Sequence, residues 1–323
     1  MRNKSLRMVP IVVLILSLTL LSNRSFSQSL SGGSGRFEFG LGIGPMFFLG
    51  DLGGSAGVGR GFVKDVDFPL TKISKMIYAS YYPSDFLGFR LALNHGVLEG
   101  DDAMTPDKGG PEVDRLLRNL SFRTSVFEGY LAAEIYPTVF IERYDGTKGK
   151  LRPYGVIGIG LMKYNPKTKD VDGKYVALQP LHLEGQGMAE YPDSKPYKLL
   201  QKEIPMGVGF KYYIRENMFI GMELLHRMLF TDYIDDVSND SYIDASLFAS
   251  YLPAPQAAQA QRLYYRGNYS IPGQAANTAG LERGDPEDND AFFSTIIRFG
   301  FKLPDQNDPG NRARRQMRCP VYY

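Results

Sequence analysis

Tryptophan is absent from this sequence of 323 residues, and cysteine occurs once, as Cys319. A single cysteine excludes an intramolecular disulfide framework and any metal site made of several cysteines. After Leu21, no apolar run reaches the roughly 18 residues that a transmembrane helix needs. The formal charge is only +2, without the basic stripe of a nucleic-acid-binding protein, so we expect no nucleic-acid partner.

Aromatic residues are abundant by contrast, with 21 tyrosines and 20 phenylalanines. The chain shows no helical core pattern that would bury so many rings. Aromatic girdles at the two membrane interfaces are a feature of membrane proteins. The composition therefore favours a protein that meets a membrane along its surface.

The first segment of the chain has the pattern of an export signal. Met1–Leu21 begins with basic residues and continues with the apolar run Val9–Leu21, which is too short to span a bilayer as a helix. Small residues at 25 and 27 favour cleavage between Ser27 and Gln28. We predict a signal peptide at 1–27; a membrane anchor is the alternative.

Phe37–Phe48 alternates large apolar residues with glycine and one carboxylate. With a two-residue period, Phe37, Leu41 and Ile43 share one face of a strand, while Glu38 and three glycines share the other. A face of small residues with one acid suits a narrow polar interior better than open solvent. Apolar residues toward lipid and small or charged ones toward a lumen are typical of a transmembrane β-barrel.

Seven further segments have strand character, and several repeat this alternation. They are Lys72–Tyr82, Phe86–Leu98, Ser121–Tyr136, Arg152–Tyr164, Ile204–Tyr213, Met218–Phe230 and Phe292–Lys302. Each is near the 9–11 residues, roughly, of a tilted membrane strand. The sequence therefore predicts an all-β fold, an eight-stranded antiparallel outer-membrane β-barrel with long extracellular loops. A soluble β-sandwich is the alternative, but it needs a solvated face that most of these strands lack.

The expected organisation follows from the connections. The barrel occupies 28–302, with long loops at about 49–71, 99–119, 165–202 and 231–291, and a basic tail follows at 303–323. Outer-membrane barrels keep short turns and both termini in the periplasm. The predicted location is the outer membrane, with its lipid as the first partner.

Charged residues of both signs fall on the inward parity of these strands. Four acids and four bases are predicted to pair inside the lumen, because an unpaired buried charge is costly: Glu38, Arg90, Glu128, Glu134, Lys211, Glu223, Arg227 and Arg298. The glycines of Phe37–Phe48 are expected to leave room for the arginines. Eight strands enclose a space that side chains fill. We therefore expect a plugged interior, with a proton or ion path as the alternative.

Two other groups of residues raise the possibility of chemistry. His95 and His226 fall on the lipid-facing parity near the outer ends of their strands, where a histidine beside a serine would suit a lipase. Asp232, Asp235 and Asp236, with further acids at 240 and 244, are a weak calcium candidate, although their spacing is not that of an EF-hand. The bland interpretation of each is an interface histidine and a solvated loop mouth. We predict no catalytic residue and no cofactor.

Two segments outside the strands have a biased composition. Pro253–Gln261 is rich in Ala and Gln and is interpreted as a mobile part of the last loop. The tail after the last strand carries Arg312, Arg314, Arg315 and Arg318, which are candidates for docking a periplasmic partner. A solvated end of the chain is the alternative for this tail.

Several stretches resemble the PorG-type outer-membrane barrels of Bacteroidota, which are associated with type IX secretion. They are Leu49–Gly54, Pro153–Gly160, Tyr164–Lys167, Leu178–Gly187, Ile204–Lys211 and Phe230–Ser238. The Gln-Pro-Leu run at 179–181 and Thr-Asp-Tyr-Ile-Asp-Asp-Val-Ser at 231–238 lie in loops, where barrel patterning does not dictate sequence. The loop Ser246–Asp290 has no counterpart in this resemblance.

The resemblance implies a non-enzymatic component of the type IX secretion and gliding machinery. Such a barrel would anchor the periplasmic ring of that machine to the outer membrane, through Pro137–Lys150 or the basic tail. Two alternatives remain. One is a free-standing surface barrel that binds partners through its long loops. The other is an outer-membrane enzyme, which would need a serine or acid beside His95 or His226.

Overall fold

The computed structural model describes residues 37–52, 68–105, 112–138, 150–215, 217–267, 283–286 and 289–303. The predicted signal peptide with its cleavage after Ser27, and the arginines of the tail, lie outside the described residues. So does most of Pro137–Lys150.

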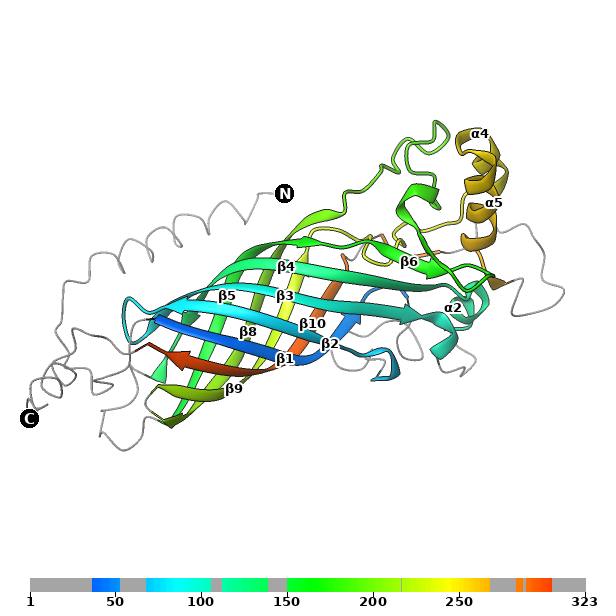
Figure 1. Ribbon diagram of the computed structural model, residues 1–323. Helices are drawn as coiled ribbons and strands as arrows, with labels where there is room; N and C mark the ends of the chain where they lie inside the picture. The colour runs from blue at the N-terminus through cyan, green and yellow to red at the C-terminus, as the bar shows by residue number, and fades with distance from the viewer. Residues whose placement is uncertain are drawn as a thin grey trace, which may run out of the picture. The chain divides into compact units, whose positions relative to one another are not determined.

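Eight long strands form the wall of the molecule (Figure 1). They are β1 (Phe37–Leu49), β2 (Lys72–Tyr81), β3 (Leu87–Asp101), β4 (Ser121–Ile135), β5 (Leu151–Lys163), β8 (Leu200–Arg215), β9 (Met218–Leu229) and β10 (Ala291–Lys302). Each strand pairs antiparallel with the next, β5 with β8, and β10 with β1. Because no edge is left open, the predicted eight-stranded antiparallel barrel is confirmed.

The register fixes the slant of the strands. A circuit of paired residues runs from Phe210 on β8 through β9, β10 and β1 to Lys75 on β2. It continues through His95 and Phe127 to Lys163, and returns to β8 at Leu200. The circuit thus closes ten residues from its start, 210 against 200. Such a stagger tilts the strands against the barrel axis.

Every residue on this circuit points outward and is exposed. The outward faces of all eight strands carry large apolar side chains that would be costly in water. Leu41 is 61% exposed, Ile159 70% and Val208 63%. At the end with short turns, Phe37 and Tyr81 pack with ring centroids 5.1 Å apart. An apolar band edged with aromatic rings is the lipid-facing surface of a membrane barrel.

The connections at the other end contain regular elements that the sequence analysis missed. A hairpin, β6 (Pro166–Lys169) and β7 (Tyr175–Ala177), continues the sheet beyond β5 by pairing with β4. The helices are α2 (Glu112–Arg118), α4 (Phe248–Tyr251) and α5 (Ala254–Leu263), and the 3-10 turns are Phe68–Leu70, Asp102–Met104, Gln179–Leu181 and Ala245–Leu247. No helix in the described part of the chain is long and apolar enough to cross a membrane.

The interpretation of Pro253–Gln261 as a mobile loop was wrong. This stretch forms most of α5, and its small side chains at Ala257 and Ala260 are buried against neighbouring loops. The predicted strand bounds also fell short where strands rise above the belt: β3 extends to Asp101, and β8 begins at Leu200 rather than Ile204.

Candidate functional site

The barrel interior is built in three layers, because each strand places every second residue inside. Along the middle of β9 the inward residues are Glu223, Leu225 and Arg227, so charge, apolar and charge follow one another. β10 repeats the order from its other end with Arg298, Ile296 and Ser294. β3 contributes Arg90, Ala92 and Asn94. All these side chains are buried, so the strands stack an apolar layer between two polar ones.

All eight residues of the predicted lumen network point into the interior. Glu38, Arg90, Glu128, Glu134, Lys211, Glu223, Arg227 and Arg298 are each fully buried. Six of them meet in the layer nearer the short turns, and Glu128 and Arg227 belong to the layer nearer the long loops. They form two groups rather than one.

The first group, the lower layer, is a continuous set of ion pairs. Lys211 Nζ lies 2.9 Å from Glu38 Oε1 and 3.0 Å from Glu134 Oε2. Arg298 Nη1 lies 3.0 Å from both Glu134 Oε1 and Glu223 Oε2. Arg90 Nη1 donates to the same Glu223 oxygen at 2.8 Å. Three bases and three acids from six strands thus compensate one another away from water, which is the condition for burying them.

Tyrosines complete the lower layer, although the predicted network contained only acids and bases. The Tyr82 hydroxyl donates to Glu38 and Glu134 at 3.0 Å each. Tyr154 donates to Glu223 at 2.5 Å, and Tyr136 donates to Glu134. These hydroxyls satisfy carboxylate lone pairs that the bases leave over. The two-residue period places these tyrosines on the inward face, but tyrosines near the ends of barrel strands usually belong to the aromatic girdle at the membrane interface.

The expected role of the glycines in β1 was wrong in detail. The space opposite Gly40 is filled by Tyr78, and the space opposite Gly42 by Met76 and Ile296. The arginines do not enter these spaces directly. Instead, the guanidinium of Arg298 lies over the Tyr78 ring, 4.1 Å from its centroid. The glycines make room for ring and thioether side chains that in turn hold the charges.

The second group, the upper layer, depends on one ion pair. Arg227 Nε and Nη2 donate to Glu128 at 2.9 and 3.2 Å, a bidentate contact. Asn94 donates to Glu128, and Arg227 also donates to Ser294. Glu203 lies in the same region, 1% exposed, with its carboxyl group within hydrogen-bond reach of Glu128. The predicted strand began at Ile204 and so left Glu203 out.

The loops beyond the barrel pack into a folded cap, which we define as residues 164–199, 230–267, 283–286 and 289–290. It shares one hydrophobic core with the outer ends of the strands, in which Phe122 and Phe292 meet Ile234, Phe248 and other cap residues. Tyr164, Tyr197 and Tyr233 stack nearly parallel, with centroids 6.4 and 4.6 Å apart. The outer end of the described barrel is therefore covered by protein.

The two loop runs that carry the family resemblance meet inside the cap. Glu184, from the run 178–187, accepts hydrogen bonds from the backbone N–H of Ser238 at 2.9 Å and of Asn239 at 3.2 Å. Arg283 completes this contact by an ion pair to Glu184, with Nε–Oε1 2.8 Å. The buried carboxylate of Glu184 thus holds the backbone of the second run in place.

The acidic cluster is not the solvated loop mouth that the sequence suggested. Asp235 and Asp236 are each 1% exposed. Burial raises the pKa of Asp232 to about 8 and that of Asp236 to about 7. Burial, together with the neighbouring carboxylates of Asp51 and Asp232, also raises the pKa of Asp235. The cluster therefore binds protons more strongly when the cap is folded.

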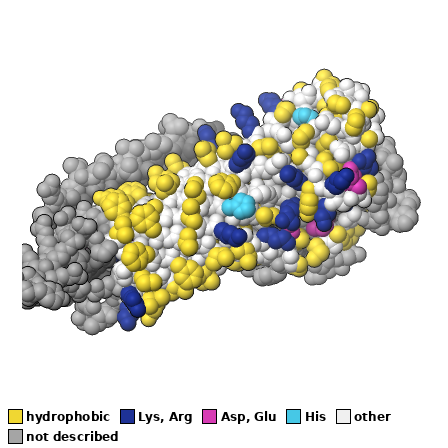
Figure 2. Space-filling view, in the orientation of Figure 1, with side chains coloured by type: hydrophobic (Ala, Val, Ile, Leu, Met, Phe, Trp, Pro, Cys, Tyr) yellow, Lys and Arg dark blue, Asp and Glu magenta, His cyan; other side chains and the backbone are white. Residues whose placement is uncertain are grey.

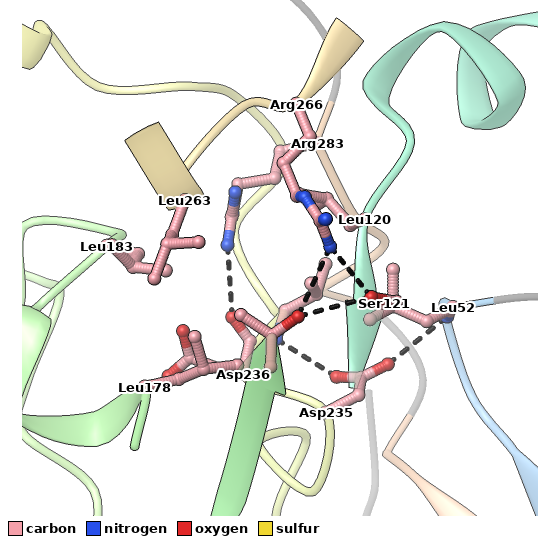
Figure 3. Close-up of a pocket in the computed structure, with 12 residues that line it drawn as sticks. Leu52, Leu120, Ser121, Leu178, Leu183, Asp235, Asp236, Leu263, Arg266 and Arg283 are labelled. Atoms are coloured by element: carbon pink, nitrogen blue, oxygen red, sulfur yellow. Dashed lines mark hydrogen bonds between the residues drawn. The ribbon is translucent and has the colours of Figure 1, made fainter. Parts of the chain in front are cut away.

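The weak calcium candidate at Asp232, Asp235 and Asp236 gains no support from the structure. No group of three His, Cys, Asp or Glu residues within the described chain is arranged to hold a metal ion. Asp235 instead accepts from the backbone N–H of Leu52 and Val237, at 3.2 and 2.9 Å (Figure 3). Asp236 accepts from the Tyr197 hydroxyl at 2.5 Å. These carboxylates tie loops together.

A small cavity lies between these loops and the top of β4 (Figure 3). Arg266 and Arg283 enter it from the cap, and Asp236 and Ser121 line it from below. It leaves about 10 Å³ for the centre of a water-sized molecule. That is room for one water, and too little for an organic ligand.

His95 has the neighbour that the enzyme hypothesis requires. Its Nε2 lies 2.9 Å from Ser125 Oγ on the next strand, on the outward face. A catalytic pair also needs a group that orients the histidine and donors for an oxyanion. No carboxylate within the described chain contacts His95, and the strand N–H groups around it serve the ladder. His226 is half-buried on the outward side of β9.

Comparison with known proteins gives a likeness of fold only. No family model and no curated protein matches the chain. Among solved structures it is similar to outer membrane protein OprG from Pseudomonas aeruginosa, 13% identical over 85% of this chain and 98% of that one, TM-score 0.37. Neisserial surface protein A is 8% identical over 84% and 99%, TM-score 0.37. E. coli Outer Membrane Protein W is 13% identical over 84% and 98%, TM-score 0.31.

The class of the protein follows from its own strand pairings and lipid-facing band. The chain is an eight-stranded membrane-spanning β-barrel of the outer-membrane type, with a charge-filled interior and a folded outer cap.

Proposed function

We propose that this barrel is a non-enzymatic anchor of the type IX secretion and gliding machinery, which holds the periplasmic ring of that machine at the outer membrane. The family resemblance suggests the machine. The structural observation that supports an anchoring role is the filled interior.

A pore or transporter needs a path for its solute, whereas buried side chains fill the interior formed by the described strands. The lower layer, the apolar layer around Leu225 and Ile296, and the Glu128–Arg227 pair follow one another along the axis. Removing one member of such a layer leaves a buried charge uncompensated. A barrel built this way is a rigid membrane plug, suited to holding other proteins in place.

The anchoring contact belongs at the end with the short turns, which faces the periplasm in outer-membrane barrels. The described chain there presents the turn between β2 and β3 and the one between β8 and β9. The connection 137–150 and the tail 303–323 begin at the same end, after β4 and β10.

Cross-linking in cells tests this anchor. Full-length barrel, a variant without 303–323 and a variant with 137–150 shortened are each tagged, cross-linked and purified. We expect periplasmic ring proteins to co-purify with the full-length barrel and to be lost with one truncation. A matched variant with 253–263 of the cap replaced by a Gly-Ser linker controls for general damage. Failure of the full-length barrel to capture any ring protein would overturn the proposal.

The folded cap favours a second candidate, a surface barrel that binds partners outside the cell. A cap that shares a hydrophobic core with the strand ends and contains the buried Arg283–Glu184 pair holds a fixed surface. The cap-linker variant separates the two functions. If the barrel is an anchor, the cap-linker variant still supports secretion and gliding. If the barrel is a surface receptor, the variant loses the binding of outside partners, even if it still captures ring proteins.

A further inference from the structure

Basic side chains follow the outer edge of the barrel wall on one side. Lys75 on β2 and Lys163 on β5 lie on the same outward register row, with His95 and Phe127 between them. Further bases face outward beyond this row on β4 and β6, and one outward step below it on β8. We call this set the basic half-rim: Lys75, Arg123, Lys163, Lys167 and Lys202.

The other side of the barrel lacks such residues. The Lys and Arg residues of β1, β9 and β10 are Arg227, Arg298 and Lys302, and all three are buried inside. The outward positions at the same end of these strands include the apolar Phe47, Met228 and Phe293, beside His226 and Thr295. Phe47 and Phe293 stack there with ring centroids 4.7 Å apart. The exposed bases are therefore confined to one side of the barrel, and an anionic partner would bind on that side.

The half-rim keeps most of its charge available. Glu99 is shared by two bases, with Lys72 and Arg123 each 2.8 Å from one of its oxygens. No acid within the described chain forms an ion pair with Lys75, Lys163, Lys167 or Lys202, and all four are exposed. Figure 2 shows Lys and Arg side chains gathered between the hydrophobic wall and the outer end.

On β5 and β8 the half-rim borders the outer edge of the apolar band. On β5, Lys163 follows the exposed Leu161 and Ile159 of the apolar band by one outward step. On β8, Lys202 lies opposite Leu161 in the register. Lys75 lies between the exposed Ile73 and Ile77, and its four-carbon chain can carry the ammonium toward the interface.

We propose that the basic half-rim binds the phosphate groups of anionic lipid headgroups in the outer leaflet. Neighbouring strands are about 4.8 Å apart, so Lys75 and Lys163, three strands apart, stand roughly 14 Å from each other. That separation lets several bases contact one large phosphorylated headgroup or two adjacent lipids. Lysine is a common phosphate ligand, and exposed bases beside an anionic surface attract it. This inference is independent of the anchoring function.

Native mass spectrometry of the purified barrel tests the proposal. The probes are a diphosphorylated glycolipid, lipid A, and the same lipid after removal of its phosphates. We expect the intact barrel to retain the phosphorylated lipid, and the variant Lys75→Gln, Lys163→Gln, Lys202→Gln to bind it roughly tenfold or more weakly. The matched control is Lys174→Gln, Lys195→Gln, Arg215→Gln, which removes three exposed charges elsewhere and keeps binding.

Three results would overturn the proposal: equal binding of the dephosphorylated lipid, equal loss in the control variant, or full competition by a soluble polyphosphate at the same phosphate concentration. The last would assign the surface to a soluble polyanion. Heat-shifted migration on gels shows that each variant is folded. Lysine-to-arginine replacement at the three positions keeps the charge and should restore binding.

Discussion

Arg298 shows how much of the interior depends on a single side chain. Its guanidinium contacts Glu134 and Glu223 at 3.0 Å, and Glu38 at 3.5 Å, so it joins three acids from three strands. It also packs over the face of the Tyr78 ring. None of these partners lies near it in sequence. The contact was predictable as an inward base among inward acids, but its partners depend on the register.

Replacing this residue should be costly. Arg298→Met leaves three buried carboxylates with less compensation, and we expect the free energy of unfolding to fall by about 3–5 kcal/mol. Urea unfolding in detergent and heat-shifted gel migration measure the loss. Arg215→Met, at the exposed end of β8, is the matched control and should change little. Equal stability of the two variants would mean that the lower layer contributes nothing.

At the scale of the strand, β1 can be tested through its glycines. A Cβ at Gly40 would collide with the Tyr78 hydroxyl and with the carbonyl oxygen of Phe299, whereas one at Gly155 on β5 meets nothing within 4 Å. Gly40→Ala should therefore destabilise the barrel by about 1–3 kcal/mol, and Gly155→Ala should be neutral. The same urea titration compares them. An unaffected Gly40→Ala would show that Tyr78 moves aside freely.

The strands were predictable from the sequence and the cap was not, for a physical reason. In a strand between lipid and lumen the environment alternates from one residue to the next. The spacing of Phe89, Leu91 and Leu93 therefore predicts that they face the lipid. The cap core has no period, because residues such as Ile234 and Phe248 come from irregular loops. The α5 helix buries small alanines, so its Ala- and Gln-rich sequence lacks a clear apolar pattern and looks like a low-complexity segment.

The cap should also respond to pH. The folded cap raises the pKa of Asp232 to about 8 and of Asp236 to about 7, against 3.8 for the free side chain, because burial penalises the charged form. A raised carboxyl pKa gives stability that is complete below about pH 4 and is lost as the pH rises through 7 and 8. Hydrogen exchange of cap peptides should therefore be slower at pH 6 than at pH 9.

Amide variants test the assignment of this pH response. Asp232→Asn with Asp236→Asn removes two of the raised titrations and should reduce the difference between pH 6 and pH 9, while Asp235 still titrates. Asp193→Asn, an exposed loop acid, is the control and should leave it intact. If the double variant keeps the full pH dependence, other groups of the cap cause it.

For the whole molecule, the interior and the cap are two separate closures. The cap covers the outer end and shares its core with the tops of the strands, and the three layers fill the barrel beneath it. The charged members of the layers are strand residues, so their ion pairs do not pass through the cap. Removing the cap should therefore leave the barrel interior filled. Planar-bilayer recordings test this by measuring ion conductance.

We expect no conductance above the bare membrane for the intact barrel. Replacing 231–290 with a short linker removes most of the cap and should leave the recording unchanged, because the ion pairs of Lys211 and Arg298 remain. Adding Lys211→Ala and Arg298→Ala to the linker variant leaves three buried acids that draw in water and cations, and small cation-selective currents should appear. A refolded linker variant that conducts by itself would show that the cap is the seal. The filled interior would then no longer support an anchor over a gated pore.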